Sequence, residues 1–194
     1  MRRMSTTAAP GEADRPVLAL VNSRRRAPGG TPVDELVSPD ALRAWLAGHG
    51  LPASAPIDHD ALVTLRELRD AVRELLLARI DGRLPDPAAV EAVNAASVAA
   101  PTACRLEWTD PGAPREVRDR FGAAGAALAG ALLAADAIDL LTGPDAADLR
   151  ACTAPGCPRL LLKDHPRRQW CSTRCGDRVR ASRYYHRRRE SAAS

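Results

Sequence analysis

The stretch of sequence that decides the fold of the C-terminal quarter is CTAPGC at residues 152–157, together with WCSTRC at residues 170–175. The two cysteine pairs follow the spacing Cys-x4-Cys-x13-Cys-x3-Cys. Such close pairs suit a tetrahedral Zn2+, because each pair can donate two sulfurs from one tight turn. The residues between the first pair are turn-forming, which lets their sulfurs converge. We therefore predict a structural zinc site whose four ligands are Cys152, Cys157, Cys171 and Cys175.

Other interpretations of these cysteines remain open. They could be scattered free or redox-active thiols, although the spacing fits that poorly. His165 could replace one cysteine as a ligand, but a histidine on a polar bend is more often simply exposed. Four cysteine ligands leave no coordination position for water, so we do not expect catalysis at the metal. Cys104 lies in a predicted strand, where it would act as a small apolar filler.

The local pattern around the ligands predicts a small treble-clef-like module. Residues 159–162 and 168–170 are expected to form short strands around a bend at residues 163–166. The second cysteine pair should open a helix whose first turn carries both thiolates near its positive end. Because so small a module has almost no core, zinc binding must supply much of its folding energy, on the order of 10 kcal/mol.

Charge is distributed unevenly between this module and the rest of the chain. Residues 151–194 hold 11 basic and 3 acidic residues, a net charge of +8, whereas residues 1–150 carry a net charge of −4. A basic tail on a neutral-to-acidic body is typical of nucleic-acid-binding proteins with a separate sensing or assembly domain. A solvated basic tail without a partner is the alternative.

The segment after Cys175 is expected to be an arginine-rich helix. Guanidinium groups suit phosphates and the O6/N7 edge of guanine. Tyr184 and Tyr185 could stack, bond to phosphate, or pack back on the module, and for Trp170 we favour a structural role. The candidate nucleic-acid contacts are Arg174, Arg178, Arg180, Arg183, Arg187 and Arg188.

The N-terminal part is predicted to be mainly helical, so the fold class is mainly α (α+β). Residues 1–15 are polar and small and are expected to be disordered. A helical domain should span residues 16–142, followed by the zinc module at residues 145–190. Within that domain, residues 18–22 could be a strand or a buried helical turn. The remaining elements are helices near residues 39–48, 58–80, 87–99 and 121–141, and a hairpin with strands near 104–108 and 115–118. In the helix near 58–80, leucines at helical spacing are expected on one face, with Arg66 and Arg69 among the polar residues on the others.

Several functional classes are disfavoured by the sequence. No apolar run approaches the ~20 residues that span a bilayer, and no secretory signal is evident, so we expect a cytoplasmic protein without membrane contact. Residues 1–150 contain only two histidines, His49 and His59, and show neither a glycine-rich phosphate loop nor a paired nucleophile and base. We therefore do not expect an enzyme.

At its cysteines the sequence resembles the CGNR zinc-finger family of bacterial transcription regulators. The matching motifs are RAC at residues 150–152, WCS at 170–172 and CGDR at 175–178, where Asp177 replaces the usual asparagine. The N-terminal part is similar to the ABATE domain that precedes this finger, through LALVNS at 18–23, LRAWL at 42–46 and LRELR at 65–69. The resemblance implies a stress-related regulator that binds DNA.

These observations predict a zinc-dependent DNA-binding regulator, with residues 16–142 as a sensing or assembly domain that could take a small-molecule effector. The alternative is a zinc-stabilised protein-interaction or RNA-binding adaptor. A preference for base sequence would separate the two, because phosphate contacts alone give salt dependence without specificity. One small module buries only ~600–1,000 Å2 on DNA, so we also predict a homodimer formed through the helical domain.

Overall fold

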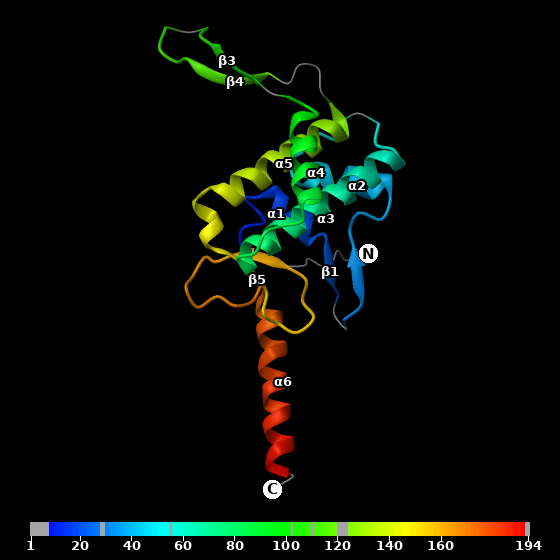
Figure 1. The fold of residues 1–194 in the computed structure, drawn as a ribbon, viewed down its shortest axis with the longest axis vertical. Coiled ribbons are helices and arrows are strands. Elements are labelled where there is room, and N and C mark those ends of the chain that lie inside the picture. Colours follow the sequence, from blue (N-terminus) through cyan, green and yellow to red (C-terminus); the bar gives the residue numbers. More distant parts are fainter. Residues whose placement is uncertain are drawn as a thin grey trace. The chain divides into compact units, whose positions relative to one another are not determined.

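The structure, a computed structural model, describes residues 8–27, 30–54, 56–101, 103–109, 111–119 and 124–192. Its helices are α1 (Pro16–Asn22), α2 (Pro39–Gly48), α3 (His59–Asp81), α4 (Pro87–Val98), α5 (Gly125–Thr142) and α6 (Thr173–Ala192), with a short 3-10 helix η1 (Pro144–Ala147) (Figure 1). The antiparallel strand pairs are β1 (Arg24–Arg26) with β2 (Pro32–Asp34), β3 (Ala103–Glu107) with β4 (Arg115–Asp119), and β5 (Leu149–Ala151) with β6 (Leu160–Leu162). The predicted mainly helical α+β class is confirmed.

The chain forms two compact units. Unit 1 comprises Met1–Asp34, Leu76–Leu84 and Leu140–Ser194, and unit 2 comprises Glu35–Leu75 and Pro85–Asp139. The compact units therefore do not follow the predicted boundary near residue 142, because the first 34 residues group with the zinc module.

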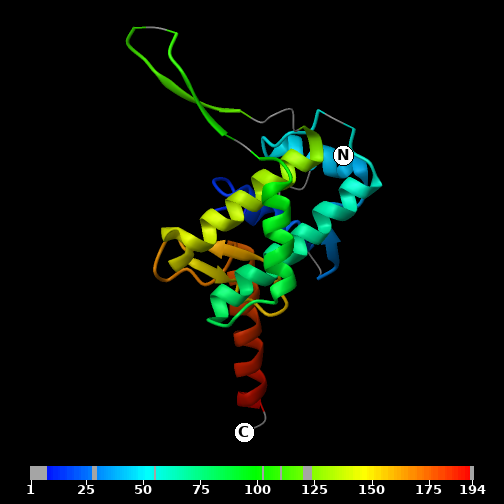
Figure 2. The same ribbon diagram turned by 45° about the horizontal axis from the view of Figure 1, so that its top comes forward.

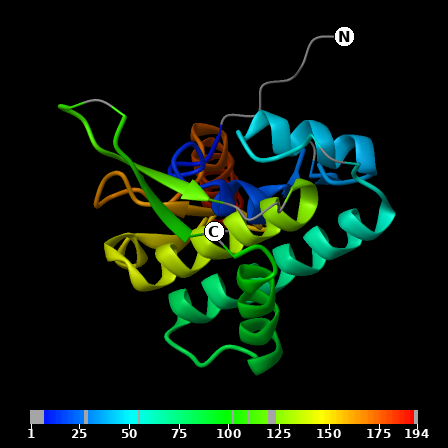
Figure 3. The same ribbon diagram turned by 90° about the horizontal axis from the view of Figure 1, so that it is seen from above.

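Unit 2 is a helical assembly in which α3 and α5 lie side by side (Figures 2 and 3). The helices predicted at residues 39–48, 58–80 and 87–99 are present, and of the helix predicted at 121–141 residues 121–123 lie outside the described part, with α5 beginning at Gly125. Side chains cap two of the helix starts: Ser38 Oγ accepts a hydrogen bond from Ala41 N at 3.2 Å, and Asp86 Oδ1 accepts one from Ala88 N at 2.9 Å. Leucines at helical spacing on α3 are buried, including Leu62, which is 2% exposed. These apolar faces form the core of unit 2.

The placement of Arg69 differs from the prediction. The periodic pattern put this arginine on a polar face of α3, but its side chain is only 1% exposed and lies 3.7 Å from the Asp70 carboxylate. Arg66, one turn earlier, donates to the Leu36 carbonyl through Nε at 2.8 Å. The arginines of the motif at residues 65–69 therefore contribute to the packing of unit 2, because Arg69 is buried and Arg66 satisfies a backbone carbonyl.

Helix α5 corrects the prediction that no apolar run approaches membrane-spanning length. By length and composition alone, Gly125–Thr142 could cross a membrane, but half of it is buried. Leu128 and Leu133 are 2% and 0% exposed. Such burial is typical of the core helix of a globular unit.

Unit 1 begins with a segment that the sequence did not predict to be ordered. Residues 10–14 form a turn, in which Arg15 N donates to Gly11 O at 3.0 Å. The prediction of disorder is therefore wrong for residues 8–15, and residues 1–7 lie outside the described part. The open choice at residues 18–22 is settled in favour of a helix, α1, whose residues Val17 to Asn22 are buried. The β1–β2 hairpin that follows had no sequence signal.

The zinc module differs from the prediction in one strand. β6 falls within the expected residues 159–162, but its partner is β5, which pairs Leu149 with Leu162 and Ala151 with Leu160. Residues 168–170 are not a strand. The Gln169 carbonyl instead accepts hydrogen bonds from the backbone N and the hydroxyl of Thr153, both at 3.1 Å. This pairing leaves Cys152 directly after β5 and places Cys157 before β6.

Candidate metal centre

The four predicted ligands converge in unit 1. All four Sγ atoms lie within 4.8 Å of one another, and they form the cysteine cluster that could hold a metal among the described residues. The Sγ–Sγ distances are 3.7 Å for Cys157–Cys171, 3.6 Å for Cys171–Cys175 and 3.8 Å for Cys175–Cys157. Cys152 accepts a hydrogen bond from the Cys171 backbone N at 3.4 Å. The structure thus brings together residues that lie up to 23 positions apart in the sequence.

These distances fit a zinc ion and exclude a disulfide. Four sulfurs at ~2.3 Å from a tetrahedral Zn2+ stand ~3.8 Å apart along each edge of the tetrahedron. A disulfide would need an S–S distance of ~2.05 Å. The cluster therefore matches a structural zinc site with four sulfur ligands. His165 is not part of it, because its ring is exposed and its Nδ1 accepts a hydrogen bond from Arg167 N at 3.1 Å.

The crowded sulfurs also shift one another's ionisation. Thiol hydrogen bonds from Cys157 and Cys171 lower the pKa of Cys152 to about 2. The proton that Cys157 shares with Cys152, together with burial, raises the pKa of Cys157 to about 11. Hydrogen bonds to Cys152 and Cys157, burial and the nearby negative charge raise the pKa of Cys171 well above its usual value. Without a cation the cluster cannot hold four thiolates, whereas Zn2+ would neutralise the charge that opposes them.

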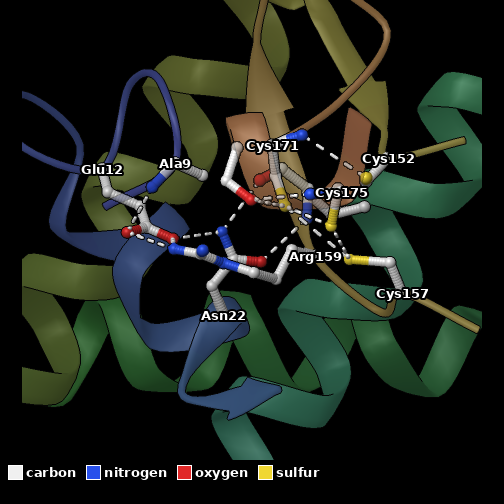
Figure 4. A network of polar contacts seen from close by, with 10 residues as sticks. Ala9, Glu12, Asn22, Cys152, Cys157, Arg159, Cys171 and Cys175 are labelled. Carbon is white, nitrogen blue, oxygen red and sulfur yellow. Dashed lines mark hydrogen bonds and ion pairs between the residues drawn. The ribbon is translucent and has the colours of Figure 1, made fainter. Parts of the chain in front are cut away.

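A buried polar network braces the module against the N-terminal segment (Figure 4). The Arg159 guanidinium, 8% exposed, donates to both carboxylate oxygens of Glu12 at 2.7 and 2.9 Å. Asn22 Nδ2 donates to Glu12 Oε1 at 2.6 Å and to the Leu160 carbonyl at 2.8 Å, while Asn22 Oδ1 accepts from Leu160 N at 2.8 Å. Burial would lower the pKa of Arg159, but the Glu12 charge more than offsets this and raises it.

This network reaches the metal ligands through the backbone. Cys152 N donates to the Arg159 carbonyl at 2.9 Å, which closes the loop carrying Cys157. Leu162 N donates to the Pro10 carbonyl at 2.9 Å. Gly11, at a φ of +90°, passes so close that an added Cβ would stand 2.8 Å from Leu162 Cγ. Sequence reasoning missed Glu12 and Asn22 as supports of the site.

The start of α6 is fixed by a side-chain cap and by the packing of Trp170. Ser172 Oγ accepts a hydrogen bond from Cys175 N at 3.3 Å, which caps the helix. Cys171 therefore lies just before α6, and only Cys175 lies in its first turn, so the prediction that both thiolates belong to that turn is half right. Trp170 packs on Gly176: an added Cβ at Gly176 would stand 2.8 Å from Trp170 Cε3. The structural role predicted for Trp170 agrees with this packing.

The predicted nucleic-acid-contacting arginines all lie on α6 and are exposed where the structure describes their side chains. Arg180 donates to Asp177 Oδ1 at 2.6 Å and lies 5.7 Å from the Trp170 ring centre. Arg188 lies 5.7 Å from the Tyr184 ring centre. Arg178 approaches Cys175 Sγ at 3.9 Å. The side chain of Arg187 lies outside the described part. The exposed set is Arg174, Arg178, Arg180, Arg183 and Arg188.

A basic hollow beside the start of α6 contains arginines that the prediction left out. This hollow, of about 340 Å3, is lined by residues that include His165, Arg167, Arg168, Trp170 and Arg180. Arg168 forms a bidentate ion pair with Asp164, which lowers the pKa of that carboxyl. The sequence signal was present in the basic pair at 167–168, but a single sequence could not place it next to α6.

Comparison with known families decides what the chain is. A family model described as "Putative stress-induced transcription regulator", ABATE, matches residues 14–144, which is more than half of the chain. The chain belongs to the ABATE family. The CGNR zinc-finger model matches residues 149–188, where the four cysteines converge. No curated protein matches the sequence.

The structure explains the CGNR motif of this ABATE-family protein residue by residue. Cys175 is one of the four cysteines that could hold the zinc ion, and Gly176 provides the surface on which Trp170 packs. Asp177, in place of the usual asparagine, is 66% exposed and pairs with Arg180. The fifth cysteine, Cys104, is not an apolar filler: it is exposed, and its Sγ donates to Glu116 Oε1 at 3.2 Å.

Proposed function

We propose that this ABATE-family protein is a cytoplasmic DNA-binding regulator of transcription, not an enzyme, and that α6 is its DNA-contacting element. The zinc site supports a binding role, because four cysteine ligands leave no position for a reacting water. The family description, a stress-induced transcription regulator, agrees with this proposal.

The exposed arginine surface of α6 is the observation that carries the proposal. Buried residues on this helix end at Val179, and every described side chain from Arg180 onward is exposed. Figures 1 and 2 show the second half of α6 extending away from β5 and β6 within unit 1. A long, exposed, arginine-rich helix has the dimensions and charge to lie in a major groove.

The zinc site gives this helix a fixed starting point. Cys171 and Cys175 anchor its first turn, and the Ser172 cap satisfies the Cys175 backbone N. The arginines of the first two turns are therefore held in place before they meet a ligand, which reduces the entropy lost on binding.

A second candidate, an RNA-binding adaptor, is favoured by the tyrosines on the same helix. Tyr184 and Tyr185 are 52% and 69% exposed, so they do not pack back on the module. Exposed aromatic rings can stack on unpaired bases, which is the common way in which proteins recognise single-stranded RNA.

Fluorescence anisotropy with zinc-loaded protein tests these proposals. Labelled duplexes of random sequence, the duplex upstream of the protein's own gene, and a single-stranded RNA would be titrated at several salt concentrations. Tighter binding to the upstream duplex than to the random pool would support a sequence-reading regulator. Preference for the RNA would favour the adaptor. No binding at low salt would refute both.

Replacing single arginines by alanine tests whether the DNA-binding surface lies on α6. Arg183→Ala should weaken binding to all duplexes and reduce the slope of log K against log salt by about 1, as expected for one lost phosphate contact. Arg43→Ala, which removes an exposed arginine from α2, is the matched control. Equal effects of both variants would contradict the assignment.

A further inference from the structure

The β3–β4 hairpin of unit 2 exposes apolar side chains along β3 and directly after it. Every described side chain of β3 is exposed except that of Glu107, which is half-buried, and Figures 1 and 2 show the hairpin extending away from the helices of unit 2. Leu106 is 66% exposed and Trp108 is 63% exposed. An isolated two-stranded hairpin is at best marginally stable in water, and three or more strands are needed for independent stability.

The residues of β3 are arranged so that the strand is complementary to itself. Antiparallel pairing about a two-fold axis through Leu106 places Arg105 opposite Glu107 of a second copy, and Glu107 opposite its Arg105. On the other face, Cys104 meets Trp108 of the second copy, and the two Leu106 side chains meet at the axis. Both charges and apolar groups match in this register, which is what an isologous interface requires. Within one copy Glu107 already pairs with Arg105 at 3.0 Å and with Arg115 of β4, so the contacts between copies would join two such pairs into one charge network.

We propose that β3 pairs antiparallel with β3 of a second copy of this chain, about a two-fold axis at Leu106, and so forms a four-stranded sheet across a homodimer. This pairing supplies hydrogen-bond partners to the outer edge of β3, which has no neighbouring strand among the described residues. It also partly covers Leu106 and Trp108. The inference does not depend on whether α6 binds DNA.

The composition of the two strands favours the edge of β3 over that of β4. β3 and the residue after it carry both exposed apolar side chains, Leu106 and Trp108. In β4, the described side chains are Arg115, Glu116 and Val117, of which only valine is apolar, and it is already half-buried. Pairing at β3 therefore removes more apolar surface from water.

Charge reversal tests the proposed register in the full-length protein. Arg105→Glu places glutamates opposite each other in the homodimer, and Glu107→Arg places arginines opposite each other. Each variant alone should show an increase of about tenfold or more in its dimer dissociation constant, measured by sedimentation equilibrium. Mixing the two variants restores both opposite-charge pairs, so the mixture should form a heterodimer about as stable as the wild-type dimer.

Cysteine cross-linking provides a second measurement that does not depend on charge. In a Cys104→Ser background with zinc bound, Leu106→Cys places two thiols at the axis and should give a disulfide-linked dimer under mild oxidation. Val117→Cys, at the centre of β4, is the matched control and should stay monomeric on denaturing gels. A wild-type monomer of 20.7 kDa at all concentrations, failure of the mixed variants to associate, or cross-linking through Val117→Cys alone would overturn the proposal.

Discussion

At the scale of single residues, the buried pair of Glu12 and Arg159 ties the N-terminus to the zinc module. Their side chains are 11% and 8% exposed. Removing one partner of a buried ion pair leaves an uncompensated charge, which costs about 3–5 kcal/mol. Glu12→Ala should therefore lower the free energy of unfolding of the module by about that amount. Asp14→Ala, which removes an exposed carboxylate two residues away, should change it by less than ~0.5 kcal/mol.

The measurement for Glu12→Ala is urea unfolding followed by the fluorescence of Trp170. Trp45 and Trp108 would be replaced by phenylalanine in all samples, so that the signal comes from the module alone. An unchanged unfolding midpoint in Glu12→Ala would show that the pair contributes nothing to stability.

Gly176 gives a second prediction at this scale. Replacing a helical glycine by alanine usually stabilises a protein by up to ~1 kcal/mol. At Gly176, however, an added Cβ would stand 2.8 Å from the Trp170 ring. Gly176→Ala should therefore destabilise the module by about 1–3 kcal/mol and shift the Trp170 emission, because the ring must move. Gly130→Ala in α5, where the nearest atom would be 3.9 Å away, should be neutral or stabilising. Thermal unfolding and emission spectra of both variants would distinguish them.

Sequence spacing predicted the metal ligands but not their supports. The four cysteines were predictable because zinc imposes a local spacing on each pair. Glu12 and Arg159 are 147 residues apart, and no local pattern connects them. Arg69 was misplaced for a different reason: periodicity distinguishes apolar from polar residues, but a charged side chain can be buried when it has an ion-pair partner, as Arg69 has in Asp70.

At the scale of elements, zinc binding is coupled to the protonation of the loop and helix that carry the ligands. The raised pKa values of Cys157, about 11, and of Cys171 mean that both thiols are protonated at neutral pH without metal, whereas Cys152, at about 2, is already a thiolate. Zinc must therefore displace a proton from each of Cys157 and Cys171. The apparent zinc affinity should rise with pH by at least about 100-fold per unit near pH 7 and fall on acidification.

Calorimetric titration of zinc into the reduced apo-protein, in buffers of different ionisation enthalpy, counts these protons. Release of two or more protons at pH 7 is expected, with loss of helical circular dichroism from α6 when a chelator removes the metal. Release of none would mean that the thiols are ionised before zinc arrives.

The predictability of an element depended on its length. The long helices α3 and α5 were predicted because an apolar face repeats over several turns. The seven-residue α1 remained ambiguous, since a run of apolar residues that short fits a strand as well as a helix. The three-residue strands β1, β2 and β5 are too short for an alternating apolar and polar pattern to show, so their sequences carry little signal.

At the scale of the whole molecule, the compact units cross the boundaries of the two family matches. The ABATE match covers residues 14–144, yet residues 8–26 supply contacts to the zinc module within unit 1. Sequence composition suggested a linker near residues 143–145, because Thr142-Gly143-Pro144 ends α5. The change in composition at residues 143–145 does not correspond to a break in packing, since Pro10 and Asn22 of the N-terminal segment form hydrogen bonds with residues of β6.

This packing predicts how the isolated finger behaves. A fragment of residues 145–194 keeps all four ligands but lacks Glu12, Asn22 and the Pro10 carbonyl, so Arg159 loses its carboxylate partner. It should bind zinc about 100-fold or more weakly than the full chain in competition with a chromophoric chelator, because a loss of ~3 kcal/mol or more in folding appears in the affinity. Adding Glu12→Ala to the full chain should reproduce part of this loss. Equal affinity of fragment and full chain would mean that the finger folds alone.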